Sequence, residues 1–425
     1  MPKQSTDISL GGQRRFEASP VLRALEGVAG TPAAPASLYV HVPFCFHKCH
    51  YCDFYSFVDK ANQQDAFVAA LRKELALLGP LSRGRAFGGL RTVFIGGGTP
   101  SLLRVDLWER LLEALHTHFD MPADEFTVEC NPETVTPELM RTLKGGGVTR
   151  VSIGAQSFDP ANLKALERWH DPANVARAVR MAADAGIQRR SIDMIFAVPG
   201  QRVEDWDMDL SRAIEIADAA PGLEHLSCYN LTYEPNTAMT RRLEKGEFAP
   251  VPEDDEAAMF RLTRSRLADH GFEAYEVSNF ARGGAARCRH NLAYWRQEPW
   301  LAAGPSASAH AAGWRWKNAG SLGEWMRHVE ANGGLAPVTD IEPPEPRRAL
   351  SERLMTGLRL IEGVDAASAL SDAEALGVAR GLRDAADRVA RKGLLMEAGG
   401  RWTLTEVGVL VGDSIAAELM AGLRA

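Results

Sequence analysis

Strand-like and helix-like runs alternate from about residue 38 to residue 230, and this alternation limits the possible folds more than any other feature of the chain. The strand-like runs are short and bounded by turn residues, and the runs between them carry apolar residues at helical spacing. The expected strands are 38–42, 91–95, 126–130, 151–153, 191–197 and 226–229. The expected helices between them are 62–78, 104–118, 137–144, 174–185 and 203–219.

Strands separated by helices predict an α/β fold with a parallel sheet and right-handed crossovers. The number of units suits a partial (β/α)6 barrel, and an open doubly wound sheet is the alternative architecture. In both architectures ligands gather at the carboxyl ends of the strands. Residues that follow the strands are therefore the first candidates for a functional site.

A loop with three cysteines follows the first expected strand. Cys45, Cys49 and Cys52 form the pattern C-x3-C-x2-C, which is too tight for a disulfide framework and one thiol short of a structural zinc site. A [4Fe-4S] cluster normally takes four thiolates, and the nearest fourth position is occupied by Phe54. Three thiolates therefore suit a metal centre that keeps one open position.

Two other interpretations of the cysteine loop remain. A zinc ion could be completed by His47 or His50, because soft ligands accept either metal. Alternatively, the three cysteines could be unrelated buried residues. The other three of the chain's six cysteines are scattered, and this usage indicates a reducing compartment.

Composition excludes several function classes. The formal net charge is −7 with 48 Lys and Arg against 55 Asp and Glu, so no global basic field would gather nucleic acid. No apolar run approaches the length that spans a bilayer, and we expect a soluble, cytoplasmic protein. Residues 1–36 mix Gly, Ser, Pro and Ala with both charge signs. They resemble neither a secretory signal nor an organellar presequence, so a mobile extension is expected.

Polar residues recur at the ends of the expected strands. The segment GGGTPS, residues 96–101, ends the second strand, and its glycines would let backbone N–H groups approach a carboxylate or amine-bearing ligand. Glu129, Gln156 and Asp193 end the next three strands, and Asn230 lies near the end of the sixth. Each one alone could be a helix cap or a surface residue. Their joint placement favours one cavity.

Several of these segments together resemble the oxygen-independent coproporphyrinogen III oxidase branch of the radical S-adenosylmethionine (SAM) superfamily. They are YVHVPFC, GGGTPS, VEC, IGAQSF and IDMIFAVPGQ, and the match runs from about residue 38 to the C-terminus. In that superfamily SAM chelates the iron that lacks a cysteine. The resemblance implies a radical SAM (TIM-like) barrel with a small, winged-helix-like C-terminal α+β domain.

The resemblance also implies which residues hold the cofactor. Tyr39 would contact SAM, and the main chain around Tyr51 would lie near the adenine. The amino group or carboxylate of SAM would be held by Gly97, Gly98 and Thr99. Its methionyl or ribose parts would be met by Glu129, Gln156, Arg168 and Asp193.

Two sequence features distinguish the oxidases of this branch from its heme chaperones. The oxidases carry a fourth cysteine where this chain has Phe54 after Asp53. The segment from Cys288 to Trp295 reproduces the HNxxYW motif of the HemW-type heme chaperones. The resemblance therefore implies a protein that binds heme and delivers it to acceptor proteins, with a homodimer and transient contact with membrane-bound respiratory enzymes. Coproporphyrinogen III oxidase activity is the alternative, and a metal-stabilised interaction module without turnover is a third reading.

The HNxxYW motif supplies the heme candidates. An imidazole is a good axial ligand and aromatic rings stack on a flat macrocycle, so the candidates are His290, Asn291, Tyr294 and Trp295. In the structural alternative, His290 satisfies a backbone carbonyl and Trp295 fills a core between domains. His310 and Cys288 are secondary candidates, and the segment GPSASAH before residue 311 departs from the GxGAH form expected there.

We expect four parts along the chain. Residues 1–36 would be the extension, 37–250 the barrel, 251–342 a barrel extension with the heme-binding motif, and 343–425 the C-terminal domain. The helix-plus-hairpin pattern of the last part resembles a winged helix, without the charge expected for DNA binding. We expect it to pack over the barrel mouth or to bind a partner.

Overall fold

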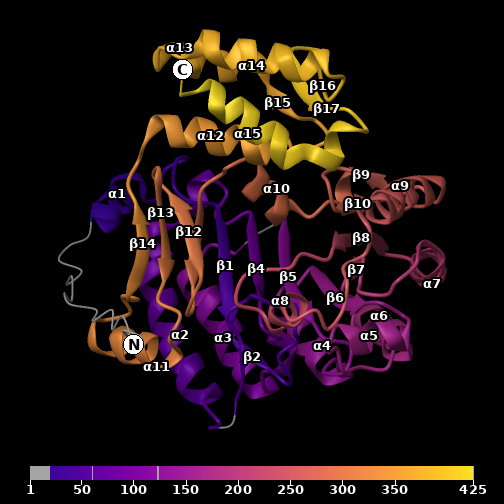
Figure 1. Ribbon diagram of the computed structural model, residues 1–425. Helices are drawn as coiled ribbons and strands as arrows, with labels where there is room; N and C mark the ends of the chain where they lie inside the picture. Colours follow the sequence, from indigo (N-terminus) through magenta and orange to yellow (C-terminus); the bar gives the residue numbers. More distant parts are fainter. Residues whose placement is uncertain (1–19, 60, 122–123, 425) are drawn as a thin grey trace, which may run out of the picture.

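A twelve-stranded sheet forms the centre of the protein (Figure 1), in the computed structural model, which describes residues 20–59, 61–121 and 124–424. The strand order is β14-β13-β12-β11-β1-β4-β5-β6-β7-β8-β10-β9. Its middle strands are parallel neighbours. They are β1 (Ser37–Val42), β4 (Thr92–Gly97), β5 (Glu125–Cys130), β6 (Arg150–Gln156), β7 (Arg189–Phe196) and β8 (Leu223–Asn230).

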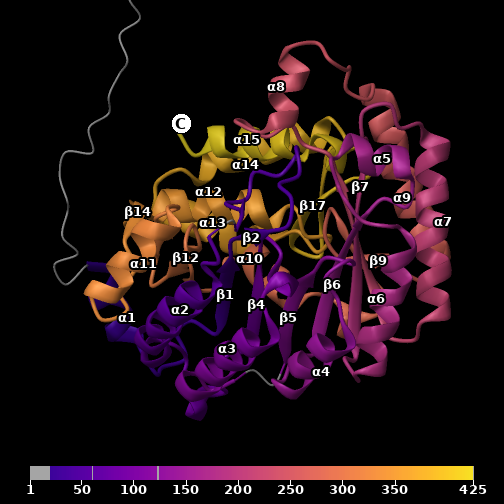
Figure 2. The same ribbon diagram turned by 90° about the horizontal axis from the view of Figure 1, so that it is seen from below.

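Helices connect these strands and line the outer side of the curved sheet (Figure 2). They are α2 (Gln64–Leu78), α3 (Val105–His118), α4 (Pro137–Gly145), α5 (Pro160–Ala165), α6 (Ala173–Asp184) and α7 (Val203–Ala219). The parallel strands follow one another in chain order without a reversal. A doubly wound sheet reverses its order at a switch point, so that alternative is wrong and the predicted partial barrel is confirmed.

Short antiparallel strands extend the sheet at both edges. One edge continues from β1 into β11 (Trp300–Ala303), which is still parallel to β1, and then into an antiparallel series. That series is β12 (Ser308–Ala311), β13 (Trp314–Asn318) and β14 (Val338–Glu342). The other edge carries β10 (Asn279–Ala281) and β9 (Glu273–Ala274). Because β1 and β8 each pair with these additions, the barrel stays open.

Residues 20–36 belong to the folded core, so the expected mobile extension is wrong for this part. Helix α1 (Pro20–Val28) buries Val21 and Leu25, which are 4% and 1% exposed. Their spacing of four residues places both on one helix face, and they join the main hydrophobic core. Residues 1–19 lie outside the described residues.

The C-terminal residues form a second, smaller core around Leu354, Ala369, Leu382 and Leu419. Its helices are α12 (Pro346–Gly357), α13 (Ala366–Ala375), α14 (Ala379–Arg391) and α15 (Gly412–Gly422). Its three-stranded sheet has the order β15-β17-β16, formed by β15 (Val364–Asp365), β17 (Arg401–Leu404) and β16 (Leu395–Ala398). The expected combination of helices with a β-hairpin is therefore present.

This C-terminal unit packs at the amino ends of the barrel strands, opposite the end where the cysteine loop lies (Figure 1). The N–H of Val277 donates to the carbonyl of Arg359 at 3.1 Å. The Arg296 and Glu362 side chains form an ion pair at 3.0 Å. The expectation that the unit covers the barrel mouth is therefore wrong. Helix α10 (Arg289–Trp295) contacts both α12 and β4, so it lies between the C-terminal unit and the barrel.

The remaining elements lie in the loops and at the edges. They are β2 (Phe44–Cys45), β3 (Phe57–Val58), α8 (Ala238–Glu244), α9 (Glu253–Asp269) and α11 (Leu322–Ala331). Across the described ranges, no helix has both the length and the apolar character to cross a membrane.

Candidate functional site

The cysteine loop begins where β1 ends, at the carboxyl edge of the parallel sheet. Phe44 is fully buried and packs edge-on against Phe57 and Phe67, at ring distances of 5.6 and 5.2 Å. The short strands β2 and β3 pair in parallel, with Phe44 opposite Phe57. This anchor fixes the two ends of the loop, so Cys45, Cys49 and Cys52 are held at one place while remaining partly exposed.

The placement of the three cysteine sulfurs can be compared with what a single ion and a cluster each require. Among the residues that the structure describes, no three His, Cys, Asp or Glu side chains converge on a position for one metal ion. In a [4Fe-4S] cluster each thiolate binds a different iron, so the three sulfurs do not need to converge. The two histidines of the zinc alternative face other groups: His47 Nε2 lies 3.7 Å from Glu167, and His50 Nδ1 lies 3.3 Å from Arg242.

The thiols of Cys45 and Cys52 are protonated near pH 7 when no metal is bound. Burial raises the pKa of Cys52 to about 11 and also raises the pKa of Cys45. Two donors lie near the sulfurs: Thr99 Oγ1 is 3.7 Å from Cys45 Sγ, and Arg168 Nη1 is 4.0 Å from Cys49 Sγ. Thiolate ligation would therefore release protons, and the Thr99 and Arg168 donors are placed to stabilise the negative charge.

The glycine segment after β4 lies directly against the cysteine loop. A Cβ atom on Gly98 would come within 2.7 Å of the Phe44 carbonyl oxygen, and one on Gly96 within 2.7 Å of Glu129 Oε2. Gly97 has a φ of 109°, which favours glycine. Only glycines therefore let this strand end approach the loop and the Glu129 carboxylate so closely.

The N–H groups of the glycine segment do not face a ligand, contrary to the expectation. Gly97 donates to Glu129 Oε2 at 3.1 Å, Gly98 to the Val42 carbonyl at 2.8 Å, and Thr99 to the Phe44 carbonyl at 2.7 Å. These bonds tie β4 to the start of the cysteine loop. What the segment can offer an ammonium group is its carbonyl oxygens, which accept hydrogen bonds.

Two carboxylates, Glu129 of β5 and Asp193 of β7, lie close to each other near the carboxyl ends of the strands. Asp193 of β7 accepts hydrogen bonds from Ser152 at 2.8 Å and from Ser227 at 2.7 Å. Burial, aided by the negative charge of Asp193, raises the pKa of Glu129 to about 7. The structure therefore brings the predicted Glu129 and Asp193 together. A neighbouring cation or hydrogen-bond donor would stabilise the charged form of Glu129.

Arg168 joins the end of β6 to the cysteine loop. Its Nη2 donates to the Gly154 carbonyl at 3.0 Å, while its Nη1 lies near the Cys49 sulfur. Gln156 adopts a φ of 63°. Its side chain packs closely on Gly154, because a Cβ atom on that glycine would come within 2.7 Å of Gln156 Nε2. Tyr51 packs on the apolar cluster that contains Leu166. These predicted residues thus gather around one end of the sheet.

Tyr39 belongs to a hydrogen-bond chain that the sequence analysis missed. Its hydroxyl lies 3.0 Å from His41 Nδ1, and His41 Nε2 lies 2.7 Å from the Tyr55 carbonyl. Burial lowers the pKa of His41 to about 4, so this imidazole is neutral. The sequence of β1 does contain a sign of this hydrogen-bond chain, because the polar residues Tyr39 and His41 alternate with apolar residues along a buried strand. Ser152 and Ser227 are similar polar interruptions in β6 and β8.

The HNxxYW motif lies at the other end of the sheet. It forms α10, and the N–H groups of Arg289 and His290 donate to the buried carboxylate of Glu125 at 3.0 and 3.1 Å. Glu125 is the first residue of β5, so these bonds hold the helix at the amino ends of the strands. Since β1 spans six residues, about 17 Å separate this end from the cysteine loop at roughly 3.3 Å per residue.

His290 is buried and its ring nitrogens are both engaged, so it does not present a free axial position. Nδ1 lies 2.8 Å from Thr92 Oγ1, and Nε2 lies 2.8 Å from the Tyr294 hydroxyl. The ring also stacks on Phe94 at 5.2 Å. Burial lowers the pKa of His290 to about 4. The expectation that His290 is the leading heme ligand does not fit this geometry. A structural role fits it, although the ring contacts two side-chain hydroxyls and not the backbone carbonyl of the structural alternative.

The other motif residues also fit structural roles here. Trp295 lies under the guanidinium of Arg359, which is 5.7 Å from the ring centroid, between the barrel and the C-terminal unit. Cys288 is buried and its sulfur lies 3.4 Å from Glu125. Asn291 is partly buried. The motif therefore joins the two halves of the molecule.

The fold and the cysteine loop define a radical SAM protein. A family model described as the radical SAM superfamily matches residues 39–213, and the HemN C-terminal domain model matches residues 345–411. The solved coproporphyrinogen III oxidase HemN from Escherichia coli has a TM-score of 0.77 over 93% of this chain and 92% of that chain. Its sequence identity is 22%, so this likeness concerns the fold alone.

Two curated relatives narrow the class further. Heme chaperone HemW of Mycobacterium tuberculosis is 36% identical over 95% of this chain and 99% of its own length. Heme chaperone HemW of Bacillus subtilis is 31% identical over 89% of this chain and 97% of its own length. The chain belongs to the HemW family.

Proposed function

We propose that this protein is a heme chaperone, which binds heme and delivers it to acceptor proteins while carrying a [4Fe-4S] cluster and SAM. The single observation that carries the proposal is the 36% identity over nearly the whole chain to a relative named heme chaperone HemW. The cofactor part of the proposal is supported by the carboxyl edge of the parallel sheet, where the cysteine loop lies against the glycine segment and Glu129.

The cluster would be held by Cys45, Cys49 and Cys52. When bound, such a cluster supplies an electron to the sulfonium of SAM. The protein's own part is to position both groups. Thr99 and Arg168 donate toward the cysteine sulfurs at 3.7 and 4.0 Å. The carbonyl oxygens after β4 would accept from the ammonium of SAM.

The remaining residues would hold the rest of SAM. Glu129 faces the glycine segment and Asp193 lies near it, so either carboxylate can accept hydrogen bonds from an ammonium or from ribose hydroxyls. Gln156 of β6 and Tyr39 of β1 would also contact SAM. The main chain around Tyr51 would lie near the adenine. A bound ammonium would also hold Glu129 in its charged form.

Oxidation of coproporphyrinogen III is the alternative function, and the fold shared with HemN is the observation that keeps it open. Phe54 argues against it. This side chain stands where the oxidases carry their fourth cysteine, and 59% of it is exposed beside the cysteine loop. Heme acceptors in the respiratory chain, a homodimer and a cytoplasmic location are part of the same proposal and follow from the family.

The test combines two assays on one anaerobically reconstituted preparation. Heme is titrated and followed by its absorbance, and coproporphyrinogen III turnover is measured with SAM and reductant. Stoichiometric heme binding without protoporphyrinogen formation supports the proposal. Turnover that is abolished by Cys45→Ala, together with only weak and nonspecific heme binding, would make the protein an oxidase.

A further inference from the structure

His41 of β1 is a buried histidine whose two ring nitrogens contact different parts of the candidate site. Only 4% of the residue is exposed. Nε2 lies 2.7 Å from the main-chain carbonyl oxygen of Tyr55, which follows shortly after Cys52, and Nδ1 lies 3.0 Å from the hydroxyl of Tyr39. Burial lowers the pKa of His41 to about 4, so the ring is neutral near pH 7 and carries one proton.

The two partners of His41 determine which nitrogen carries this proton. A carbonyl oxygen only accepts hydrogen bonds, so Nε2 holds the proton and donates it to Tyr55. Nδ1 is therefore an acceptor. The Tyr39 phenol keeps its own proton, because burial and the charge of Glu129 raise its pKa well above the usual value. The Tyr39 hydroxyl must then donate to His41 Nδ1, and its oxygen keeps only lone pairs for a further partner.

Neighbouring residues hold both the ring of His41 and the carbonyl to which it donates. The ring packs directly against the end of β4, because a Cβ atom on Gly97 would come within 2.4 Å of His41 Cε1. Tyr55 is anchored in turn, since its hydroxyl accepts from the N–H of Leu322 at 2.8 Å, where helix α11 begins. The direction of the Tyr39 hydrogen bond is therefore fixed by the surrounding structure.

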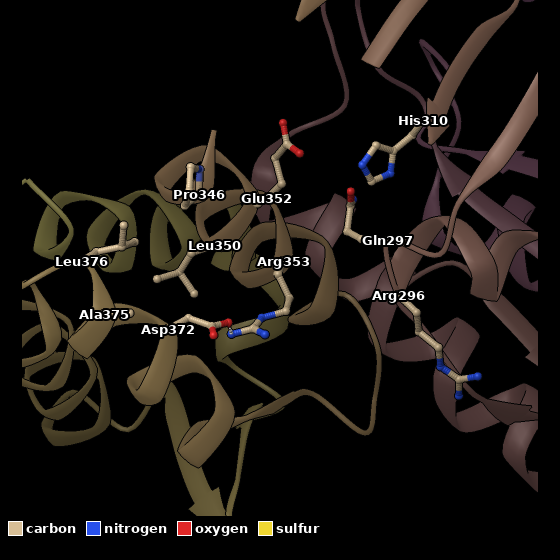
Figure 3. A pocket seen from close by; sticks show the side chains of 11 residues that line it. Arg296, Gln297, His310, Pro346, Leu350, Glu352, Arg353, Asp372, Ala375 and Leu376 are labelled. Carbon is tan, nitrogen blue, oxygen red and sulfur yellow. Dashed lines mark ion pairs between the residues drawn. The ribbon is translucent and has the colours of Figure 1, made fainter. Parts of the chain in front are cut away.

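Burial alone does not give a histidine two such bonds. His310 lines a cavity of about 580 Å³ between the barrel extension and the C-terminal unit (Figure 3). Burial is the main cause that lowers the pKa of His310 to about 4 as well. Its Nδ1 is nevertheless buried without a hydrogen-bond partner among the residues that the structure describes. By contrast, the two bonds of His41 define its tautomer.

The lone pairs of Tyr39 are available inside the barrel. Leu38 and Val40 belong to the main hydrophobic core, so Tyr39 between them faces the other side of the sheet. Glu129 is close enough for its charge to raise the Tyr39 pKa. Two acceptors, the Tyr39 oxygen and the Glu129 carboxylate, therefore lie near each other. Such a pair suits a ligand that is cationic and donates hydrogen bonds, and SAM is such a ligand through its sulfonium and its ammonium group.

We propose that His41 is a positioning residue for SAM, which holds the Tyr39 hydroxyl so that its oxygen accepts from the bound cofactor and cannot donate to it. The inference rests on the proposed function, because it concerns the SAM that the chaperone would carry. It also connects the cofactor to the cysteine loop. The Tyr55 carbonyl keeps the His41 proton on Nε2, so the position of the loop sets the direction of the Tyr39 hydrogen bond.

The experiment measures SAM affinity by equilibrium dialysis with the full-length, anaerobically reconstituted protein, normalised to its iron content. Tyr39→Phe removes the acceptor and should weaken binding roughly tenfold, the effect of one hydrogen bond to a charged group. His41→Gln keeps a donor near the position of Nε2 but offers no acceptor at Nδ1, and it should cause a comparable loss. His41→Asn places an amide oxygen near the position of Nδ1 and should restore most of the affinity. His270→Gln changes an exposed histidine and is the matched control.

The double variant separates positioning from a general structural role. If His41 acts through Tyr39, His41→Gln should cause no further loss of affinity in the Tyr39→Phe protein. A further loss in the double variant would overturn the inference, and so would an unchanged affinity in His41→Gln alone, while the proposed function stands in both cases. If the unaltered protein binds heme but no SAM, the SAM part of the proposed function fails and the inference fails with it.

A second measurement needs no cofactor and no altered affinity. In the cluster-free protein with ¹⁵N-labelled histidine, the imidazole signals that disappear in His41→Asn belong to His41. Near neutral pH they should show an uncharged ring with its proton on Nε2. A proton on Nδ1, or a charged ring, would overturn the inference because the Tyr39 hydroxyl could then not donate to His41.

Discussion

The N–H of Gly98 donates to the carbonyl of Val42 at 2.8 Å and thereby ties the end of β4 to the start of the cysteine loop. The two strands β1 and β4 are neighbours in register, with Val42 opposite Gly97. The loop that would hold the cluster is thus positioned by backbone contacts with a glycine segment. The first prediction follows from how little space this contact leaves.

Gly98→Ala should impair cluster assembly. The new Cβ would lie 2.7 Å from the Phe44 carbonyl oxygen and 2.9 Å from that of Val42, and both are backbone atoms that cannot move aside alone. We expect at least a twofold loss of iron and sulfide per chain after anaerobic reconstitution. Gly145→Ala is the control, because a Cβ there meets nothing within 4 Å. Equal iron content in both variants would contradict the positioning role.

Glu129 should make the cofactor-free protein less stable as pH rises. Its pKa is about 7 in the fold, above the 4.5 of the unfolded chain, so the native state holds the proton more tightly. The stabilisation is complete below pH 4.5 and is lost as pH rises through about 7. Its size is on the order of 1–3 kcal/mol at 1.36 kcal/mol per pKa unit.

Urea unfolding at a series of pH values checks this. Glu129→Gln keeps an acceptor for the Gly97 N–H but cannot ionise, so the variant should lose the decline between pH 4.5 and 7. Parallel pH profiles for the two proteins would show that the Glu129 pKa is not raised.

Leu25→Ala should destabilise the protein by about 2–5 kcal/mol, because it leaves a cavity where a fully packed side chain was. Leu25 is 1% exposed and belongs to the main core. Arg23→Ala on the exposed face of the same helix should change stability by less than about 0.5 kcal/mol. Thermal unfolding measures both. An equally small effect of the two substitutions would mean that residues 20–36 do not pack on the core.

His290→Ala should destabilise the protein more than His310→Ala does. The first change removes the protein partner of the Tyr294 hydroxyl, at a cost of roughly 1–3 kcal/mol. It also removes one of the two partners of the Thr92 hydroxyl, which keeps its bond to Ser37 Oγ at 2.9 Å. The second removes a ring that makes no hydrogen bond among the described residues. Urea unfolding without heme compares them. The reverse order would show that His290 is not a structural residue.

The sequence predicted the central fold because the β/α alternation is local. The six parallel strands from β1 to β8 and the crossover helices between them, except the short α5, could be identified from their own residues, with ends displaced by a few positions. The short strands β11 to β14 were missed, since four or five residues around Trp300 and Trp316 carry no clear periodicity. Helix α1 was missed because Gly, Pro and Ala around it favoured an extension.

The grouping of Glu129, Gln156 and Asp193 at one end of the sheet was predictable from the rule that ligands gather at the carboxyl ends of strands. The position of the motif around His290 could not be predicted, because no sequence pattern says at which end of a sheet a later segment will lie. Its partner Thr92 is 198 residues away in the chain. The N–H groups of the glycine segment were misassigned for a similar reason. Their acceptors Val42 and Phe44 become neighbours only when β1 and β4 pair.

The most direct test of the account is heme transfer. The heme-loaded protein is mixed with a heme-free respiratory enzyme in membranes, and the donor's Soret band and the acceptor's activity are followed together. A heme-free globin in a parallel sample measures spontaneous release. We predict that acceptor activity appears as the donor loses heme, faster than release to the globin. Heme that stays bound, or that leaves at the same rate in both samples, would contradict a chaperone function.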